Sequence, residues 1–503
     1  MSLAKVTSAA VVGLDAVPIE VEVDIASQGL PSFTIVGLPD KAIEESKERV
    51  RSAIKNSGID FPAKRITVNL APADIKKEGP AYDLPIALGI LVADERIPKL
   101  SSNVILVGEL ALDGSLRHIN GILPIVSSLK KDIGGIILPE KNAEEASLVK
   151  HIKITPARTL KDLIYHFKKE KELPEYYKKF RISAPAHSEY DLAYIKGQEQ
   201  AKRAMEIAAT GGHNLFFSGP PGSGKTLLAR TLPTIMPEMT EEEIMEITKI
   251  FSVSGMLPVG SPIVLERPFR APHHTTSSIA LVGGGTFPKP GEITLAHRGV
   301  LFMDEFPEFP RSVLEALRQP LEDGIVTVSR AQGSLTFPAK FILVAAQNPC
   351  PCGYLGDPHK ACICTPTQII KYQKRISGPL IDRIDIHVEV PKVKFEKLSD
   401  ESLAEESAKV RKRVNDARVI QIKRQGKTNS ELCNKEIKEF CKIDEKSKNI
   451  LKAAVNQLNL SARGFSRILK VSRTISDLQN QKEINPQNIA EALQYRPKER
   501  SIY

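Results

Sequence analysis

The stretch Asn214-Leu-Phe-Phe-Ser-Gly-Pro-Pro-Gly-Ser-Gly-Lys-Thr226 decides the fold of the larger part of this chain. From Gly219 onward it fits the pattern G-x-x-x-x-G-K-[ST], with an apolar strand before it and the helix-forming run LLARTLP after it. Such glycines let backbone N–H groups close around phosphates, while Lys225 supplies a charge and Thr226 a hydroxyl for Mg²⁺. The sequence therefore predicts a nucleotide-phosphate site that consists of Gly219, Pro220, Pro221, Gly222, Ser223, Gly224, Lys225 and Thr226.

Two later strands end in polar residues that suit the same site. Val300-Leu-Phe-Met-Asp-Glu305 predicts a buried strand followed by Asp304, which would hold Mg²⁺ through water, and Glu305, which would polarise the attacking water as general base. The strand FILVAAQ leads to Asn348, whose amide could touch the γ-phosphate; turns also favour Asn for their own reasons. We expect ATP and Mg²⁺ as cofactors.

Length and composition bound the class of protein. The chain has 503 residues, 42% apolar and 26% charged, which is long enough for two or three globular domains. The sequence contains no apolar run long enough to span a membrane, and acids occur too early for a signal peptide. We expect a cytoplasmic protein without a membrane partner.

The pattern along the chain predicts an ordered series of domains. Residues 1–165 alternate strands (Val17–Ile25, Ser32–Val36, Arg65–Leu70, Val104–Val107, Gly135–Leu138) with helices such as Lys41–Ser57. Residues 166–188 are charged and proline-punctuated, as expected of a linker. Residues 189–391 form an α/β core around the glycine loop, and residues 392–503 form a helical lid.

The net charge of +10 is concentrated in that lid. Residues 392–503 carry 25 Lys+Arg against 15 Asp+Glu, so the rest of the chain is neutral. A basic lid suits a polyanionic partner such as nucleic acid, and a solvated helix face is the competing interpretation.

Four of the six cysteines lie close together in the sequence, and in a cytosolic chain a disulfide framework is not expected. Thiolates at this spacing can surround one tetrahedral ion, so we predict structural zinc; paired ligands usually have two to four residues between them, and four free thiols are the alternative. The four are Cys350, Cys352, Cys362 and Cys364. We interpret Cys433 and Cys441 as core residues.

Long motifs carry a family resemblance through the whole chain. They are IKGQ from Ile195, RPFRAPHHTTSSIALVGGG, PKPGEITLAHRGVLFMDEFPEF, VLEALRQPLEDG, NPCPCGYLGD and SGPLIDRIDIHVEVP. The chain resembles the magnesium-chelatase-like AAA+ proteins called ComM or YifB. This implies an AAA+ P-loop core with a helix-2 insert, a pre-sensor 1 hairpin and an α-helical lid of the magnesium-chelatase C-terminal type, behind a Lon-protease-like (ribosomal S5 domain 2-like) α/β domain.

The resemblance also implies function and partners. It implies a DNA-stimulated, homo-hexameric ATPase that migrates branches of single-stranded and branched double-stranded DNA during recombination in natural transformation, together with recombination proteins. It places Gly197 and Gln198 at the nucleotide and Asn348 in the sensor 1 position. Arg383 would be the arginine finger that reaches a neighbouring subunit, and Arg463 the sensor 2 arginine.

The assignment of the arginines leaves alternatives open. Arg375 and Arg467 compete with Arg383 and Arg463, and a surface salt bridge is the simplest role for a lone arginine.

Two further segments are candidates for contact with DNA. Residues 325–337 alternate, turn at Gln332-Gly333 and alternate again, which predicts a β-hairpin with Arg330 near its tip. The insert from Ser252 to Gly291 carries Arg270 and the pair His273-His274, for which we favour a structural or substrate-contacting role over a metal. A plain surface hairpin is the competing interpretation.

The first domain lacks the chemistry of the proteases it resembles. Lon-type proteases use a Ser-Lys dyad, but Gly79-Pro80 is followed here by Ala81, and Asn120-Gly121-Ile122 by Leu123. With neither nucleophile nor base, we predict no proteolysis. The role that we expect for this first domain is that of a scaffold, which promotes oligomerisation or binds DNA.

Three functions compete on this evidence: a DNA motor, a magnesium-chelatase-like ATPase that remodels a protein or metal-insertion complex, and a scaffold for which ATP is only an assembly switch. The scaffold would lack Lys225, Glu305 or Asn348, and all three are present. The basic lid and the hairpin favour the DNA motor.

Overall fold

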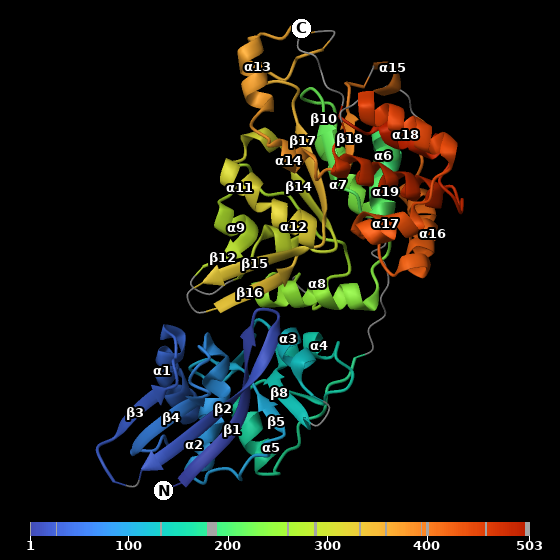
Figure 1. The fold of residues 1–503 in the computed structure, drawn as a ribbon. Helices are drawn as coiled ribbons and strands as arrows, with labels where there is room; N and C mark the ends of the chain where they lie inside the picture. The colour runs from blue at the N-terminus through green and yellow to red at the C-terminus, as the bar shows by residue number, and fades with distance from the viewer. Residues whose placement is uncertain are drawn as a thin grey trace. The chain divides into compact units, whose positions relative to one another are not determined.

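The computed structural model describes residues 2–26, 28–130, 133–178, 189–258, 261–285, 289–330, 333–357, 360–393, 395–398, 402–457 and 460–497. The chain forms two compact units (Figure 1). The N-terminal unit consists of Met1–Ser183 and Ile244–Val264, and the C-terminal unit of Ala184–Glu243 and Leu265–Tyr503.

A seven-stranded sheet in the order β3-β4-β2-β1-β5-β8-β9 forms the N-terminal unit. Its strands are β1 (Ser2–Val12), β2 (Asp15–Ala26), β3 (Ser32–Val36), β4 (Arg65–Ala71), β5 (Val104–Leu106), β8 (Gly135–Pro139) and β9 (Ile154–Ala157). The predicted strands are confirmed, whereas β1 and β9 were not expected. In β1 several inward positions are alanine or serine, residues that seldom signal a strand, although Ala4, Val6, Ser8 and Ala10 are buried in alternation.

Helices and a small hairpin complete this unit: α1 (Lys41–Asn56), α2 (Asp83–Ala93), β6 (Glu109–Leu110), β7 (Leu116–Arg117), α3 (Ile122–Ser128), α4 (Ala143–Ala146) and α5 (Leu160–Phe167). Helix α2 is buried and apolar on nearly every side, so its sequence lacks the alternation of apolar and polar faces that usually indicates a helix. Its first residue, Asp83, is buried and accepts a 2.7 Å hydrogen bond from Nε of Arg49 on α1. Helix α5 extends two residues into the predicted linker, whose residues 179–188 lie outside the described residues.

One segment from the middle of the chain belongs to the N-terminal unit. Ile244–Val264, which includes most of α8 (Glu241–Ser254), packs there although the sequence pattern placed it in the core domain. Ser252 donates a 2.5 Å hydrogen bond to Glu145, and its carbonyl accepts one from the N–H of Gly121. Glu145 is only 2% exposed, and burial raises its pKa. The contact joins residues 107 positions apart, which a local pattern cannot reveal.

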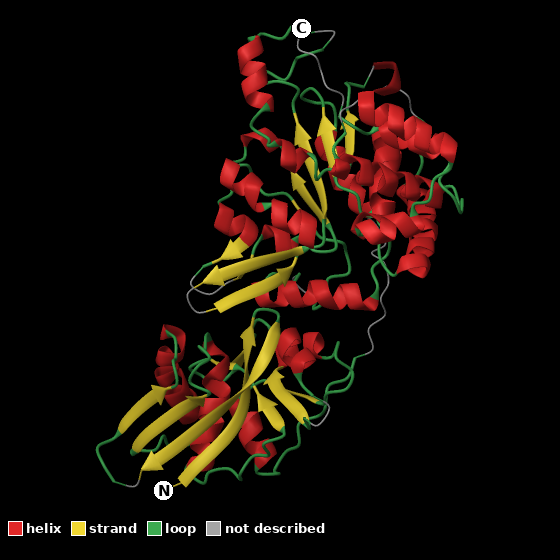
Figure 2. Cartoon of the chain, in the orientation of Figure 1, coloured by secondary structure: helices red, strands yellow, loops and turns green. Residues whose placement is uncertain are grey.

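A parallel five-stranded sheet in the order β11-β14-β17-β10-β18 organises the C-terminal unit. Its strands are β11 (Phe269–Arg270), β14 (Val300–Met303), β17 (Ile342–Gln347), β10 (Leu215–Ser218) and β18 (Ile386–Glu389), and strands are drawn in yellow in Figure 2. The strands expected before the glycine loop, before Asp304 and before Asn348 are thereby confirmed. All five end at one edge because they are parallel.

Helices and short hairpins surround this sheet: α6 (Glu199–Gly211), α7 (Lys225–Ile235), α9 (Ser278–Val282), β12 (Gly283–Gly284), β13 (Lys289–Pro290), α10 (Glu292–Leu295), α11 (Arg311–Ala316), α12 (Arg318–Asp323), β15 (Ile325–Arg330), β16 (Gly333–Pro338), α13 (Pro366–Gln373) and α14 (Gly378–Ile381). The antiparallel pair β15 and β16 confirms the predicted hairpin. Gln332 of its turn lies outside the described residues.

After β18 the described chain is helical, as predicted: α15 (Phe395–Leu398), α16 (Ser407–Gln425), α17 (Asn434–Phe440), α18 (Glu445–Gln457), α19 (Ala462–Leu478) and α20 (Pro486–Gln494). This lid shares one hydrophobic core with the sheet domain. Val414 of α16 and Ile475 of α19 join the same cluster as Ile207 of α6 and Phe217 of β10. Core and lid therefore form a single unit.

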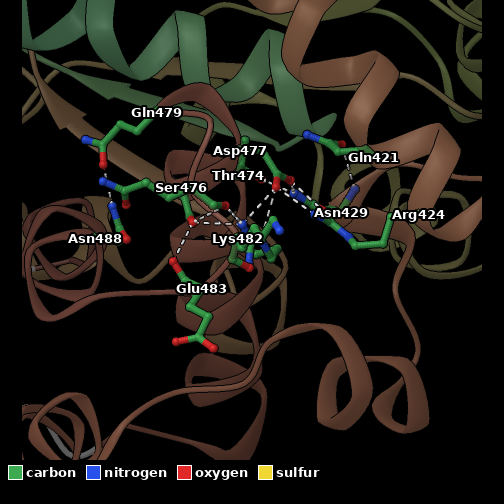
Figure 3. A network of polar contacts seen from close by, with 12 residues as sticks. Gln421, Arg424, Asn429, Thr474, Ser476, Asp477, Gln479, Lys482, Glu483 and Asn488 are labelled. Carbon is green, nitrogen blue, oxygen red and sulfur yellow. Dashed lines mark hydrogen bonds and ion pairs between the residues drawn. The ribbon is translucent and has the colours of Figure 1, made fainter.

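A buried polar network holds the lid helices together (Figure 3). The carboxylate of Asp477 on α19 is 2% exposed and accepts two hydrogen bonds from Arg424 of α16, at 2.7 and 2.8 Å. It also accepts hydrogen bonds from Asn429 at 2.9 Å and from Arg473 at 3.1 Å. One buried anion thus fixes three segments of the lid.

The two remaining cysteines differ in their exposure to solvent. Cys441 is buried as predicted, but the prediction for Cys433 was wrong, because it is exposed. Cys433 is the N-cap of α17, where its thiol and the carboxylate of Glu436 form a capping box. None of the helices in the described ranges is long and apolar enough to cross a membrane.

Candidate active site

The phosphate-binding loop lies between β10 and α7 and needs its glycines. A Cβ on Gly219 would lie 2.1 Å from the carbonyl oxygen of Val390, and Gly222 and Gly224 have φ of 74° and 93°. The N–H of Gly219 donates to the carbonyl of Gln347 at 3.2 Å, which attaches the loop to the neighbouring strand β17. The loop has the curled backbone that a phosphate site requires.

Lys225 and Asn348 meet over this loop. Lys225 is buried, with 8% of the residue exposed. Its ammonium group donates hydrogen bonds to the carbonyls of Gly219 and Pro220 at 2.7 and 2.9 Å, and to Oδ1 of Asn348 at 3.3 Å. Burial lowers the pKa of Lys225, and the negative charge of Asp304 opposes this. The ammonium group of Lys225 is thus held by two carbonyls of the loop and by the side chain of Asn348.

Thr226 and Asp304 form the second contact of the site. The hydroxyl of Thr226 donates a 3.0 Å hydrogen bond to Oδ2 of Asp304, and the N–H of Glu305 donates to Oδ1 at 2.9 Å. A hydroxyl and a carboxylate that converge in this way are oxygen ligands of the kind that Mg²⁺ prefers. The two residues therefore fit the predicted metal.

Glu305 is held by a residue whose role the sequence left open. Its backbone has φ of 50°, a left-handed conformation uncommon outside glycine, and Oε2 lies 3.1 Å from Nδ1 of His274. His274 follows β11, which pairs in parallel with β14, so both residues emerge from the same sheet edge. The sequence would have predicted this contact if β11 had been recognised as a strand, because parallel strands end at the same edge of a sheet.

Gln198 lies against the phosphate-binding loop, and its predicted contact with the nucleotide stays a prediction. Its side chain donates to the carbonyl of Ser223 at 3.2 Å and to that of Pro391 at 2.6 Å. Both Gly197 and Gln198 have positive φ, at 61° and 59°, just before α6. The pair therefore bridges the loop and the segment that leads to the lid.

Arg383 and Arg463 lie together at the opposite edge of the sheet. Arg383 precedes β18, whose Ile386 pairs with Leu215 at the start of β10, whereas Lys225 comes after the end of β10. Both guanidinium groups form ion pairs with Glu322 of α12: Nη2 of Arg383 with Oε2, and Nη2 of Arg463 with Oε1 at 3.1 Å. Neither arginine reaches the phosphate loop of its own chain.

The two competing arginines are engaged elsewhere. Arg375 forms an ion pair with Glu308, and Arg467 forms one with the buried carboxylate of Asp385. The pKa of Asp385 is lowered by Arg467 and His213 against the effect of burial. Arg467 therefore has a structural partner in this chain.

Of the two arginines predicted to contact DNA, the structure describes the side chain of Arg270 only. Arg270 forms a bidentate ion pair with Glu292, at 2.6 and 2.8 Å. Arg330 is the last residue of β15, and its side chain is outside the described part of the structure.

The four clustered cysteines converge. Their sulfur atoms all lie within 4.8 Å of one another, with Cys350 to Cys352 at 3.4 Å, Cys350 to Cys362 at 3.6 Å and Cys352 to Cys362 at 3.5 Å. A tetrahedral zinc site with Zn–S of about 2.3 Å needs sulfur atoms about 3.8 Å apart. Cys364, whose sulfur accepts from the N–H of Cys352 at 3.4 Å, completes the set. Thus the residues fit zinc despite the single residue between paired ligands.

The positions of the protease dyad hold apolar side chains. Ala81 lies in the short 3₁₀ helix Pro80–Tyr82, and Leu123 is fully buried in α3. The N–H of Leu123 donates to Glu145 at 2.9 Å. Neither position offers a nucleophile or a base.

Three segments of the chain match known protein families. Residues 191–398 match the family described as magnesium chelatase, subunit ChlI; residues 21–142 match subunit ChlI of Mg-chelatase; and residues 404–496 match magnesium chelatase, subunit ChlI C-terminal.

Two of three relatives match this chain over nearly its full length, and the third matches a part of it. The competence protein ComM of Haemophilus influenzae is 47% identical over 502 residues, which cover 99% of this chain and 98% of that protein. YifB of Escherichia coli is 43% identical over 507 residues, which cover 100% of this chain and 98% of that protein. The chloroplastic magnesium-chelatase subunit ChlI of Chlamydomonas reinhardtii is 28% identical over 185 residues, covering 32% of this chain and 44% of that protein.

Proposed function

The chain belongs to the ComM/YifB family, which has magnesium-chelatase ChlI-like domains, and from this premise we propose that it is a hexameric, ATP-dependent DNA motor. The observation that carries the proposal is the convergence of Lys225, Thr226, Asp304 and Asn348 at one sheet edge. These side chains come from three different strand ends and supply the cation, the metal ligands and the polar amide that phosphoryl transfer needs.

We derive the roles of the residues from their positions. Lys225 would exchange its bonds to loop carbonyls for bonds to phosphate oxygens, and Thr226 and Asp304 would hold Mg²⁺. The metal, when bound, would neutralise charge on the phosphates. Glu305 would accept the proton of the attacking water, with His274 setting the direction of its carboxylate.

A neighbouring subunit would complete the site. Charge on the γ-phosphoryl group calls for a further cation. The two arginines predicted to supply it, Arg383 and Arg463, lie at the edge of their own sheet that is opposite the phosphate-binding loop. This supports their action in trans, with Arg383 as arginine finger and Arg463 as sensor 2, and hence a closed ring of subunits.

Several features favour DNA as the substrate. The lid is basic, strand β15 of the hairpin ends at Arg330, and the full-length relative is named a competence protein. We propose branch migration that integrates single strands during recombination in natural transformation. The alternative, a remodelling ATPase on a protein or metal-insertion complex, is supported by the similarity to magnesium-chelatase subunits, which covers only part of the chain.

Two structural roles belong to this proposal. We propose that Cys350, Cys352, Cys362 and Cys364 bind one structural zinc ion beside the sensor 1 strand, since Cys350 comes two residues after Asn348. The N-terminal unit would be a Lon-protease-like domain without its Ser-Lys dyad, which acts as a scaffold for oligomerisation or for holding DNA.

The test compares ATP hydrolysis without DNA, with single-stranded DNA and with a three-stranded or four-way junction, followed by junction unwinding. We expect DNA to raise turnover, and Lys225→Ala to abolish both hydrolysis and unwinding. Lys99→Ala, which removes an exposed lysine of the N-terminal unit, should behave as the unmodified protein. Hydrolysis that ignores DNA, without strand displacement, would favour the remodelling ATPase.

A further inference from the structure

Glu322 is the shared partner of the two arginines assigned to the neighbouring subunit's ATP. One of its carboxylate oxygens pairs with Arg383 and the other with Arg463. The arginine side chains differ in exposure, since that of Arg383 is 10% exposed and that of Arg463 is 54% exposed. A single anion therefore holds two cations from segments that are far apart in the sequence.

The cavity around this pair is lined by nine Lys and Arg side chains and five Asp and Glu side chains, so cations are in excess. Arg383, Arg463 and Glu322 line this cavity, which has a volume of about 750 Å³ and lies between the sheet domain and the lid. Its further cationic side chains are Arg267, Arg298, Lys340, Arg418, Lys427, Arg467 and Lys470. The hydrogen bond from Arg383 is the main reason that the pKa of Glu322 lies below its usual range, so the carboxylate is ionised at neutral pH. The buried Nε of Arg383 has no partner among the described residues. The guanidinium group thus retains capacity for another anion.

Glu322 is also connected to the hairpin that the proposed function places on DNA. It lies in the last turn of α12, which ends at Gly324 in a left-handed conformation with φ of 67°. Strand β15 begins at the next residue, and the carbonyl of Gly324 accepts a 2.8 Å hydrogen bond from the N–H of Ala339, directly after β16. Both strands of the hairpin are therefore anchored within two residues of Glu322.

We propose that Glu322 is a latch, which holds Arg383 and Arg463 away from phosphate until DNA on the hairpin β15–β16 displaces the end of α12. The latch rests on the proposed function, which supplies two of its elements: the action of Arg383 and Arg463 on the neighbouring subunit's ATP, and the contact between the hairpin and DNA. In the latched state the carboxylate competes with the γ-phosphate of the neighbouring subunit for the same guanidinium groups. When the hairpin moves, Glu322 moves with it, and the freed arginines complete the adjacent site.

The test is the variant Glu322→Gln, which keeps the shape of the side chain but removes its charge. The ATPase rate without DNA should rise by about two- to fivefold, the range expected for loss of a partly exposed ion pair. The rate with single-stranded DNA should change little, so the ratio of the two rates falls by the same factor. Asp323→Asn is the matched control, because it removes the same charge from the next, exposed residue and should leave both rates unchanged.

Each outcome separates the latch from the proposed function. Unchanged rates in Glu322→Gln would overturn the latch, and so would a loss of activity as deep as that of Arg383→Ala, since Glu322 would then be needed for activity. If Arg383→Ala itself retained full activity, the trans role in the proposed function would fail instead. Hexamer assembly is checked by light scattering. If Glu322→Gln does not assemble, Glu322→Asp, which is too short to hold both arginines, should raise the DNA-independent rate in the same direction.

Discussion

The hydroxyl of Thr226 donates a 3.0 Å hydrogen bond to a carboxylate oxygen of Asp304, which joins the first turn of α7 to the end of β14. The two residues are 78 positions apart, and the contact exists because β10 and β14 end at the same edge of a parallel sheet. We interpret this pair as the Mg²⁺ site.

Removal of the Thr226 hydroxyl tests that interpretation. Thr226→Val keeps the shape of the side chain but loses the oxygen, so ATP hydrolysis should fall by about 100-fold or more and require higher Mg²⁺. Thr226→Ser retains the hydroxyl and should keep most of the activity. Equal rates in the two variants over a Mg²⁺ titration would contradict the assignment.

Glu305 should be required for hydrolysis but not for binding. Glu305→Gln cannot accept a proton, so the turnover of ATP should fall by about 10²- to 10⁴-fold. Binding of a fluorescent ATP analogue should stay close to that of the unmodified protein, because Lys225 and Asp304 are unchanged. A variant that neither binds nor hydrolyses would assign Glu305 to binding instead.

His274 should act on Glu305 through orientation. We expect His274→Ala to lower kcat by about tenfold while KM for ATP changes little, since the variant loses the approach of Nδ1 of His274 to the carboxylate of Glu305 and leaves the phosphate-binding loop unchanged. His274→Gln, which can still donate a hydrogen bond, should restore part of the rate. If KM rises while kcat stays constant, His274 contributes to nucleotide binding and not to the position of the base.

The cysteine cluster should bind about one zinc ion per chain. Elemental analysis of the purified protein should find it, and Cys362→Ser should lose it, whereas Cys433→Ser, which changes an exposed thiol outside the cluster, should not. Zinc removal by a chelator should lower the melting temperature, because the metal binds only the folded loop. Protein without stoichiometric zinc would end this idea.

Loss of the buried carboxylate of Asp477 should destabilise the lid. Asp477→Ala would leave the buried Arg473 and the partly buried Arg424 without their counter-charge, and we expect the free energy of unfolding to fall by about 3–5 kcal/mol. Urea unfolding of the full chain measures this. Glu439→Ala changes an exposed acid of the same lid and should shift the free energy by less than about 0.5 kcal/mol.

Local sequence signals were sufficient to predict which strand ends meet at the candidate ATP site. The glycine loop, Asp304, Glu305 and Asn348 each follow a short apolar strand, and such strands are readable because their side chains must be buried. Once the strands are taken as parallel, their ends must meet, which is why Lys225 contacts Asn348 and Thr226 contacts Asp304. The β15–β16 hairpin was equally readable from its alternation.

Other features needed the tertiary structure. The packing of Ile244–Val264 on the N-terminal unit depends on a contact between Ser252 and Glu145, and no local pattern encodes a pairing over that distance. Cys433 was mistaken for a core residue because a thiol can serve as a helix cap as well as a buried group.

By itself, then, the sequence determined which groups are the candidates to bind phosphate, hold a metal and accept a proton, because those roles are tied to residue type beside a strand end. Only the tertiary structure decided which of these groups share a partner: His274 with Glu305, and Arg383 with Arg463 on Glu322. Ion pairs of this kind join elements that are remote in the chain, and their energy depends on distance and burial that exist only after folding.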